Sequence, residues 1–183
     1  PAQYSGAYSG RKAIDGDIPE LRSHEEADHA WAVDGKTAGG KGWITLRWVQ
    51  RVRVGEVIYY GRTSWGVEEC WKEYEVLLDD EAEPAARGTF EMNSGPQRIA
   101  LAPRPVRKVT LRFNSSYGGP NPGAAEIEVY GESPAEGDLP KLLRLPTNWA
   151  PRAEVWASSA FSEVHRAALA LSLIHISEPT RPY

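Results

Sequence analysis

Apolar and polar residues alternate in short runs through the first 130 positions, a pattern typical of half-buried β-strands. Seven such runs are separated by turns that contain Gly, Pro, Asp or Asn, and no long amphipathic helical pattern comes between them. The predicted strands cover residues 43–48, 52–59, 74–78, 88–92, 97–101, 108–113 and 126–130. In the second run the alternation slips at Gly55, where a β-bulge would restore it. We therefore predict an all-β fold, an antiparallel β-sandwich of the jelly-roll kind, with Trp43 on a core strand.

Three connections between the predicted strands are candidates for a functional site. Residues 15–42 and 61–73 are longer than hairpins require, and a shorter loop spans residues 114–122. Ligands usually bind to long loops that a rigid scaffold holds in place. We therefore expect any function to lie in these loops, at one end of the sandwich.

Composition removes several classes of function. The chain has 183 residues and a formal net charge of −4, which disfavours non-specific binding to nucleic acid because phosphate neutralisation needs surplus cations. Its one cysteine, Cys70, excludes an intrachain disulfide framework and a multi-cysteine zinc site. The longest apolar stretch, residues 167–176, is interrupted by Ser172 and His175, so no transmembrane segment is predicted.

The sequence offers no set of residues with the spacing of a catalytic site. Cys70 has histidines only at distant positions, and Asp79-Asp80 is typical of a hairpin turn. The run from His24 to His29 lacks the order of a helical zinc motif, so we interpret it as a solvated acidic loop. We predict that this chain is not an enzyme and that any catalytic domain lies in parts of the protein outside it.

The second and third loops contain the residue types of a sugar site. Aromatic rings can stack on the apolar face of a pyranose, while planar polar groups bind its hydroxyls. The predicted ligand-binding residues are Arg62, Trp65, Glu68, Trp71, Tyr117 and Asn121. Among them, Arg62 and Asn121 are expected to donate hydrogen bonds to hydroxyls. The alternative is that Trp71 caps the core and that Arg62 and Glu68 form a surface ion pair.

Five segments in order carry a resemblance to a known family. They are Lys12–Asp17, Ala30–Trp31, Gly42–Leu46, Val54–Val57 and Ala124–Tyr130. Over about residues 3–131 the chain resembles discoidin domains, also called coagulation-factor type C domains, which overlap with the family-32 carbohydrate-binding modules. The resemblance implies a galactose-binding-like jelly roll without catalytic residues, often appended to secreted or surface enzymes of bacterial type.

A calcium ion is the cofactor that the sequence suggests. Asp15 and Asp17 flank a glycine and Glu126 could supply a third oxygen ligand, the donor type that Ca²⁺ prefers. The family resemblance implies that the matching loop and glutamate hold a structural calcium. A threonine expected just before the tryptophan is absent, and His29 stands two residues before Trp31 instead. The alternative is that Asp15 and Asp17 only shape a turn.

The rest of the chain suggests further domains. Residues 132–148 are rich in small, acidic and turn residues near their start and are interpreted as a linker after a first domain at 1–131. Residues 149–171 resemble the truncated start of a second discoidin-like domain. Residues 172–183 look like a translated sequencing adapter, for which we expect no role.

Together these features predict a non-catalytic carbohydrate-binding module of a larger, secreted multidomain protein, located outside the cell or on its surface. Its expected partner is a glycan or glycoconjugate, with further domains linked in cis. Two alternatives remain open: a structural spacer packed on a neighbouring catalytic domain, and an adhesion module that binds a protein or membrane surface through loop aromatics.

Overall fold

The computed structural model describes residues 6–131 and 148–157. Residues 132–147 of the predicted linker, residues 158–171 of the predicted second domain and the adapter-like tail lie outside these residues. No helix in the described ranges is long and apolar enough to cross a membrane.

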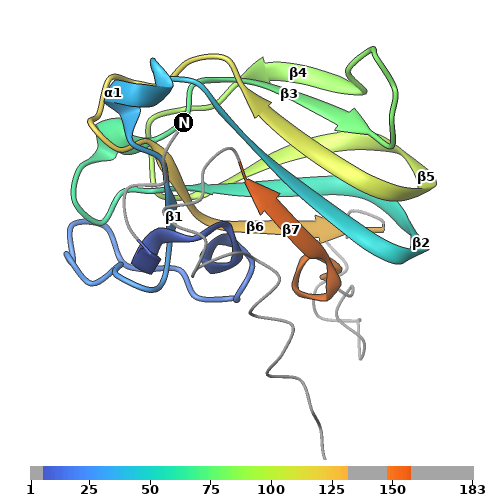
Figure 1. The fold of residues 1–183 in the computed structure, drawn as a ribbon, viewed down its shortest axis with the longest axis horizontal. Coiled ribbons are helices and arrows are strands. Elements are labelled where there is room, and N and C mark those ends of the chain that lie inside the picture. Colours follow the sequence, from blue (N-terminus) through green and yellow to red (C-terminus); the bar gives the residue numbers. More distant parts are fainter. Residues whose placement is uncertain (1–5, 132–147, 158–183) are drawn as a thin grey trace, which may run out of the picture.

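The framework of the domain is one long antiparallel ribbon made of β2 (Gly42–Gly61) and β5 (Pro96–Phe113). Its register shifts between Arg47 and Val52 and again between Val54 and Glu56. Such irregularities bend a strand and increase its twist, so the ribbon turns and its two halves lie in opposite layers (Figure 1). The sequence analysis predicted two strands in place of each of β2 and β5. A bend within one strand interrupts the alternation of apolar and polar residues in the same way as a turn between two strands.

The other strands extend the two halves of this ribbon. The order is β1-β6-β2-β5-β3-β4, and every paired strand runs antiparallel to its neighbour. The flanking strands are β1 (Trp31–Ala32), β3 (Glu73–Leu78), β4 (Ala86–Thr89) and β6 (Gly123–Tyr130). The described part of the chain is therefore the all-β antiparallel sandwich that the alternation predicted.

Short helices lie before the first strand and in the connections between later strands. They are η1 (Gly6–Tyr8), η2 (Gly10–Ala13), α1 (Gly35–Ala38), η3 (Val67–Glu69) and η4 (Ala150–Arg152). The α1 turn begins at Asp34, whose side chain accepts a hydrogen bond from the Lys36 backbone N–H, and ends at Gly39 in the left-handed region. Because these helices are short, the loops and not a helical layer provide the surface for a site.

The core lies between the layers, with a cluster of aromatic rings near the end that carries the long loops. Trp71 stacks on Phe113 with ring centroids 4.7 Å apart, and Trp31 lies 5.9 Å from both rings. Along β2, Ile44, Leu46 and Trp48 point inward. The expectation that Trp43 belongs to the core is therefore wrong: it lies on the opposite face, with Thr45 and Arg47, and is 40% exposed.

Residues 148–157 pack against the first domain. Strand β7 (Glu154–Ala157) pairs antiparallel with Ile44–Arg47 of β2, and Figure 1 shows it lying beside that strand. The side chain of Val155 is buried, and Trp48 Nε1 donates a 2.8 Å hydrogen bond to the Trp149 carbonyl. The structure thus places residues 149–157 against the first domain, while residues 158–171 of the predicted second domain lie outside the described residues. The physical reason is that residues 44–47 offer a free strand edge, and β7 pairs with its backbone groups.

Candidate binding site

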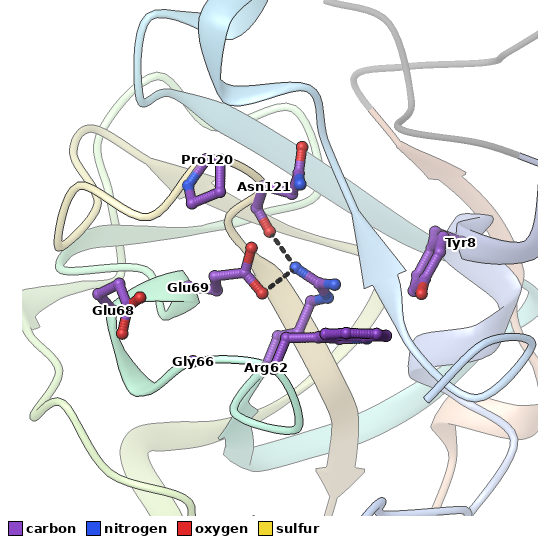
Figure 2. A pocket seen from close by; sticks show the side chains of 8 residues that line it. Tyr8, Arg62, Gly66, Glu68, Glu69, Pro120 and Asn121 are labelled. Atoms are coloured by element: carbon purple, nitrogen blue, oxygen red, sulfur yellow. Dashed lines mark hydrogen bonds and ion pairs between the residues drawn. The ribbon is translucent and has the colours of Figure 1, made fainter. Parts of the chain in front are cut away.

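A cavity of about 340 Å³ opens among the loops at one end of the sandwich (Figure 2). Residues from three separate segments line it: η1, the loop after β2 and the loop before β6. They are Tyr8, Arg62, Trp65, Gly66, Glu68, Glu69, Pro120 and Asn121. The structure therefore brings together four of the six residues chosen from the sequence, namely Arg62, Trp65, Glu68 and Asn121.

Arg62 ties the loops of the site together. Its side chain is 2% exposed, and its Nη1 donates hydrogen bonds to Glu69 Oε2 at 2.5 Å and to the Asn121 carbonyl at 2.7 Å. Its Nη2 forms an ion pair with Glu26, and the guanidinium lies 5.1 Å from the centre of the Tyr8 ring. Arg62 therefore holds the site in shape. The expectation that it donates to a ligand hydroxyl is wrong, because Nη1 and Nη2 are already engaged inside the protein.

Glu26 is a site residue that the sequence analysis missed. It belongs to the run interpreted as a solvated acidic loop, yet it is buried against Arg62. Burial raises the pKa of Glu26, while the nearby Arg62 guanidinium acts in the opposite direction. Nothing in the local sequence separates Glu26 from its exposed neighbour Glu25, because the partner that buries it is 36 positions away.

Backbone contacts fix the Glu26 loop against the loop that contains the cavity. The N–H of Arg22 donates to the Thr63 carbonyl and that of His24 to the Ser64 carbonyl, each at 3.2 Å. The hydroxyls of Ser23 and Ser64 lie 2.9 Å apart. The floor of the cavity is thus held by main-chain bonds as well as by the Arg62 ion pairs.

Trp65 and Glu68 are the exposed aromatic and the exposed charged residue of the site. Trp65 is 52% exposed, and its ring centroid lies 4.4 Å from that of His24. The Glu68 carboxylate lies near Gly66, where a Cβ would meet it at 2.6 Å. An accessible indole at a cavity that also carries an exposed carboxylate can stack on a sugar ring while the carboxylate binds its polar groups.

Two of the residues selected from the sequence do not line the cavity. Trp71 is completely buried, stacks on Phe113, and its backbone N–H donates to the Tyr59 hydroxyl at 3.0 Å. Its assignment to ligand binding is wrong, and the alternative that it caps the core is correct. Tyr117 donates from its hydroxyl to the Phe90 carbonyl at 2.6 Å and lies outside the cavity lining. Trp71 therefore serves packing, while Tyr117 is half-buried away from this cavity and its role in binding stays a prediction.

Four further lining residues carried no signal that the sequence analysis used. They are Tyr8, Gly66, Glu69 and Pro120. Glu69 is buried although it follows the exposed Glu68, because the η3 turn directs its side chain toward Arg62. Two adjacent glutamates thus have opposite environments, which only the fold distinguishes.

The candidate calcium ligands come together in part. Glu126 Oε2 accepts a 3.2 Å hydrogen bond from the Gly16 backbone N–H, which joins the Asp15–Asp17 turn to β6. Its Oε1 is buried and has no hydrogen-bond partner within the described part of the chain. Burial raises the pKa of Glu126 to about 8, and the nearby charge of Asp15 adds to the increase. A buried carboxylate oxygen without a partner fits a cation, and the donor type suits Ca²⁺.

Asp17 has a different neighbour. Its carboxylate lies 2.7 Å from Nδ1 of His29. Across residues 6–131 and 148–157, no three Asp, Glu, His or Cys side chains lie close enough to form a metal-binding group. A cation at this turn would therefore depend on Glu126 together with backbone carbonyl oxygens.

Comparison with known proteins identifies the fold of this chain. No protein-family model matches the sequence, and no curated protein matches it. Among solved structures, the lectin domain of lectinolysin, complexed with Lewis B antigen, superposes with a TM-score of 0.55 at 18% identity, over 72% of this chain and 89% of that one. The chain has the discoidin-like fold.

Two further structures support this assignment of the fold. An F5/8 type C domain from Bacteroides fragilis matches with a TM-score of 0.54 at 19% identity, over 72% of this chain and 90% of that one. A CBM32 module from Clostridium perfringens, in complex with GalNAc-β-1,3-galactose, matches with a TM-score of 0.55 at 17% identity, over 69% and 86%. The discoidin-like resemblance seen in the sequence is thereby confirmed at the level of the fold.

Proposed function

We propose that this discoidin-like domain is a non-catalytic carbohydrate-binding module that holds a terminal sugar in the cavity beside Trp65. The observation that carries the proposal is an indole more than half exposed at the mouth of a 340 Å³ cavity whose floor is fixed by buried ion pairs. Two proteins of similar fold are described in complex with glycans, Lewis B antigen and GalNAc-β-1,3-galactose.

Recognition would divide between stacking and hydrogen bonding. The indole of Trp65 covers the apolar C–H face of the sugar, while Asn121 and the Glu68 carboxylate bind its hydroxyls. A small ligand buries few atoms, so one site should bind in the high micromolar to millimolar range, at about 4–6 kcal/mol. Linked copies or linked domains would raise the overall affinity by avidity.

Catalysis has no support at this site. Cys70, next to the lining residue Glu69 in the chain, is a candidate nucleophile, but it is buried. Burial, together with the carboxylates of Glu69 and Glu68, raises the pKa of its thiol to about 12. A thiol that stays protonated at neutral pH is a poor nucleophile, which favours binding without chemistry.

The test of the proposal compares two exposed tryptophans. Trp65→Ala should weaken binding to the glycans retained on an array by about tenfold or more, because the stacking surface is lost. Trp43→Ala is the matched control, since Trp43 is also exposed but lies on the outer face of β2. Both variants should melt like the wild type. Equal glycan affinity in all three proteins would contradict a sugar site at Trp65.

The glycan array and a liposome sedimentation assay distinguish this function from the two alternatives. A structural spacer would bind no glycan on the array, and an adhesion module would sediment with liposomes and lose this property in Trp65→Ala.

We further propose that one Ca²⁺ lies between the Asp15–Asp17 turn and Glu126. We also propose that the domain works outside the cell or on its surface, in cis with other domains of a larger bacterial-type protein.

A further inference from the structure

The charged group of the cavity that no lining cation neutralises is an acceptor. Arg62 is the cationic donor among the lining residues, and its Nη1 and Nη2 are bound to Glu69, Glu26 and the Asn121 carbonyl. The remaining charged group is the Glu68 carboxylate, which is exposed and has no ion-pair partner within the described residues. A ligand that fits this set of groups should bring donors of its own.

The charge of the cavity is negative in either protonation state of Glu26. The positive charge of Arg62 is balanced by Glu69 alone, its partner at 2.5 Å. Glu68 then leaves one uncompensated negative charge, and an ionised Glu26 would leave two. A negative site with low-dielectric walls concentrates cationic ligands.

We propose, on the basis of the proposed sugar site, that this cavity selects saccharides that carry a protonated amino group. An ammonium group has three donors and no acceptor, which matches a site of carboxylate and amide oxygens. Its hydrogen bonds to a carboxylate are charge-assisted and shorter than those of a neutral hydroxyl. The exposed face of Trp65 adds attraction for the same group, since aromatic faces attract cations.

The specificity is assigned to Glu68 in particular. Glu69 and Glu26 are already committed to Arg62, so their charges hold the loops in place. Glu68 lies at the cavity with its carboxylate against Gly66, where it contacts solvent and can meet a bound amine. The comparisons are made at a single neutral pH, so that the charge of the ligand amine is the same throughout.

Pairs of ligands that differ only in N-acetylation provide the test. Titration calorimetry would compare glucosamine and galactosamine oligomers with their N-acetylated forms of equal length, because acetylation removes the charge and keeps the ring. We expect the amines to bind about fivefold more tightly at low salt, and the preference to decrease as ionic strength rises from about 0.05 M to about 0.5 M.

Two Glu→Gln variants test whether the preference for amines depends on Glu68. Glu68→Gln should bring the ratio of amine affinity to N-acetyl affinity from about fivefold to near one, whatever it does to hydroxyl binding in both classes. Glu83→Gln is the control, because Glu83 is exposed in the connection between β3 and β4 and lies outside the cavity. It should leave both affinities unchanged.

The outcomes separate this inference from the function on which it rests. If N-acetylated oligomers bind in a Trp65-dependent way and the amines bind no more tightly, the amine preference is overturned and the sugar site stands. A preference that persists in Glu68→Gln overturns the assignment to this cavity. If neither class of oligomer binds, the amine inference is overturned, and the sugar site is then decided by the glycan array with Trp65→Ala.

Discussion

At the scale of single residues, side chains with the same chemistry serve opposite purposes in this domain. Trp65 is open to solvent while Trp71, six positions later, fills the core. Glu68 is exposed and its neighbour Glu69 is buried against Arg62. Arg62 itself is an internal tie between loops and not a ligand-binding donor. The site therefore consists of a small exposed set held by a larger buried one.

Replacing Arg62 should destabilise the domain strongly. Arg62→Met leaves Glu26 and Glu69 buried without their cation, and removal of one partner from a buried ion pair costs about 3–5 kcal/mol. Arg112→Met is the control, since Arg112 pairs with Glu75 at the surface and such pairs contribute about 1 kcal/mol or less. Urea unfolding measures both. Similar midpoints for the two variants would contradict the role assigned to Arg62.

The Cys70 thiol should be protected in the native state. Its pKa is raised from 9.0 to about 12 by burial, so the folded form favours the protonated thiol. The stabilisation linked to this proton is fully present below pH 9 and is lost as the pH rises toward about 12. We expect a thiol reagent at pH 8 to react quickly in urea and very slowly without it. Rapid labelling of the folded domain would contradict this prediction.

At the scale of elements, the bent β2–β5 ribbon and the returning β7 determine the architecture. The register shifts allow two continuous strands to contribute to both layers of the sandwich. Strand β7 then pairs with residues 44–47 of β2 from a distant part of the sequence. The stability of the domain should therefore depend on residues beyond the predicted boundary at 131.

Two valines test the contribution of β7. Val155→Asp places a charge in the buried interface between β7 and the core and should cost about 3 kcal/mol or more. Val49→Asp is the matched control, because Val49 is 84% exposed on β2. Thermal melting should show a large decrease for the first variant and little change for the second. Equal melting temperatures would show that residues 148–157 contribute nothing to the first domain.

At the scale of the whole molecule, the loops that line the cavity come from positions far apart in the chain. The segment from Arg62 to Glu69 and Asn121 meet because β2 ends and β6 begins side by side, where Gly61 pairs with Ala124, and Tyr8 of η1 lies against the Arg62 guanidinium. The Asp15–Asp17 turn is connected to β6 through the Gly16–Glu126 hydrogen bond. A ligand at either place would therefore stabilise contacts between distant segments.

A bound Ca²⁺ should stabilise the fold as a whole. A ligand that binds only the folded form adds about 2.7 kcal/mol at a hundredfold excess over Kd. We expect chelator to lower the melting temperature by several degrees in the wild type. In Glu126→Gln the chelator should have no effect, because the buried carboxylate is lost. An unchanged wild-type melting curve, with no metal in the purified protein, would contradict the calcium proposal.

Much of the fold follows from the sequence, because alternation reports directly which residues face a core. The all-β class and the discoidin-like fold are both evident in the order of residues. Alternation alone does not show which face of a strand is covered, so Trp43 was assigned to the wrong side. It also does not distinguish a bent strand from two strands, as β2 and β5 demonstrate.

The sequence by itself determined the residue types of the site and the loops that carry them. Only the tertiary structure decided which of those residues face a ligand. Burial and charge pairing depend on partners distant in sequence: Arg62 meets Glu26 from one loop and the Asn121 carbonyl from another. Trp71 is a core residue because Phe113 and Trp31 pack against it. Trp65 is left at the surface because the fold brings no such partners over its exposed face.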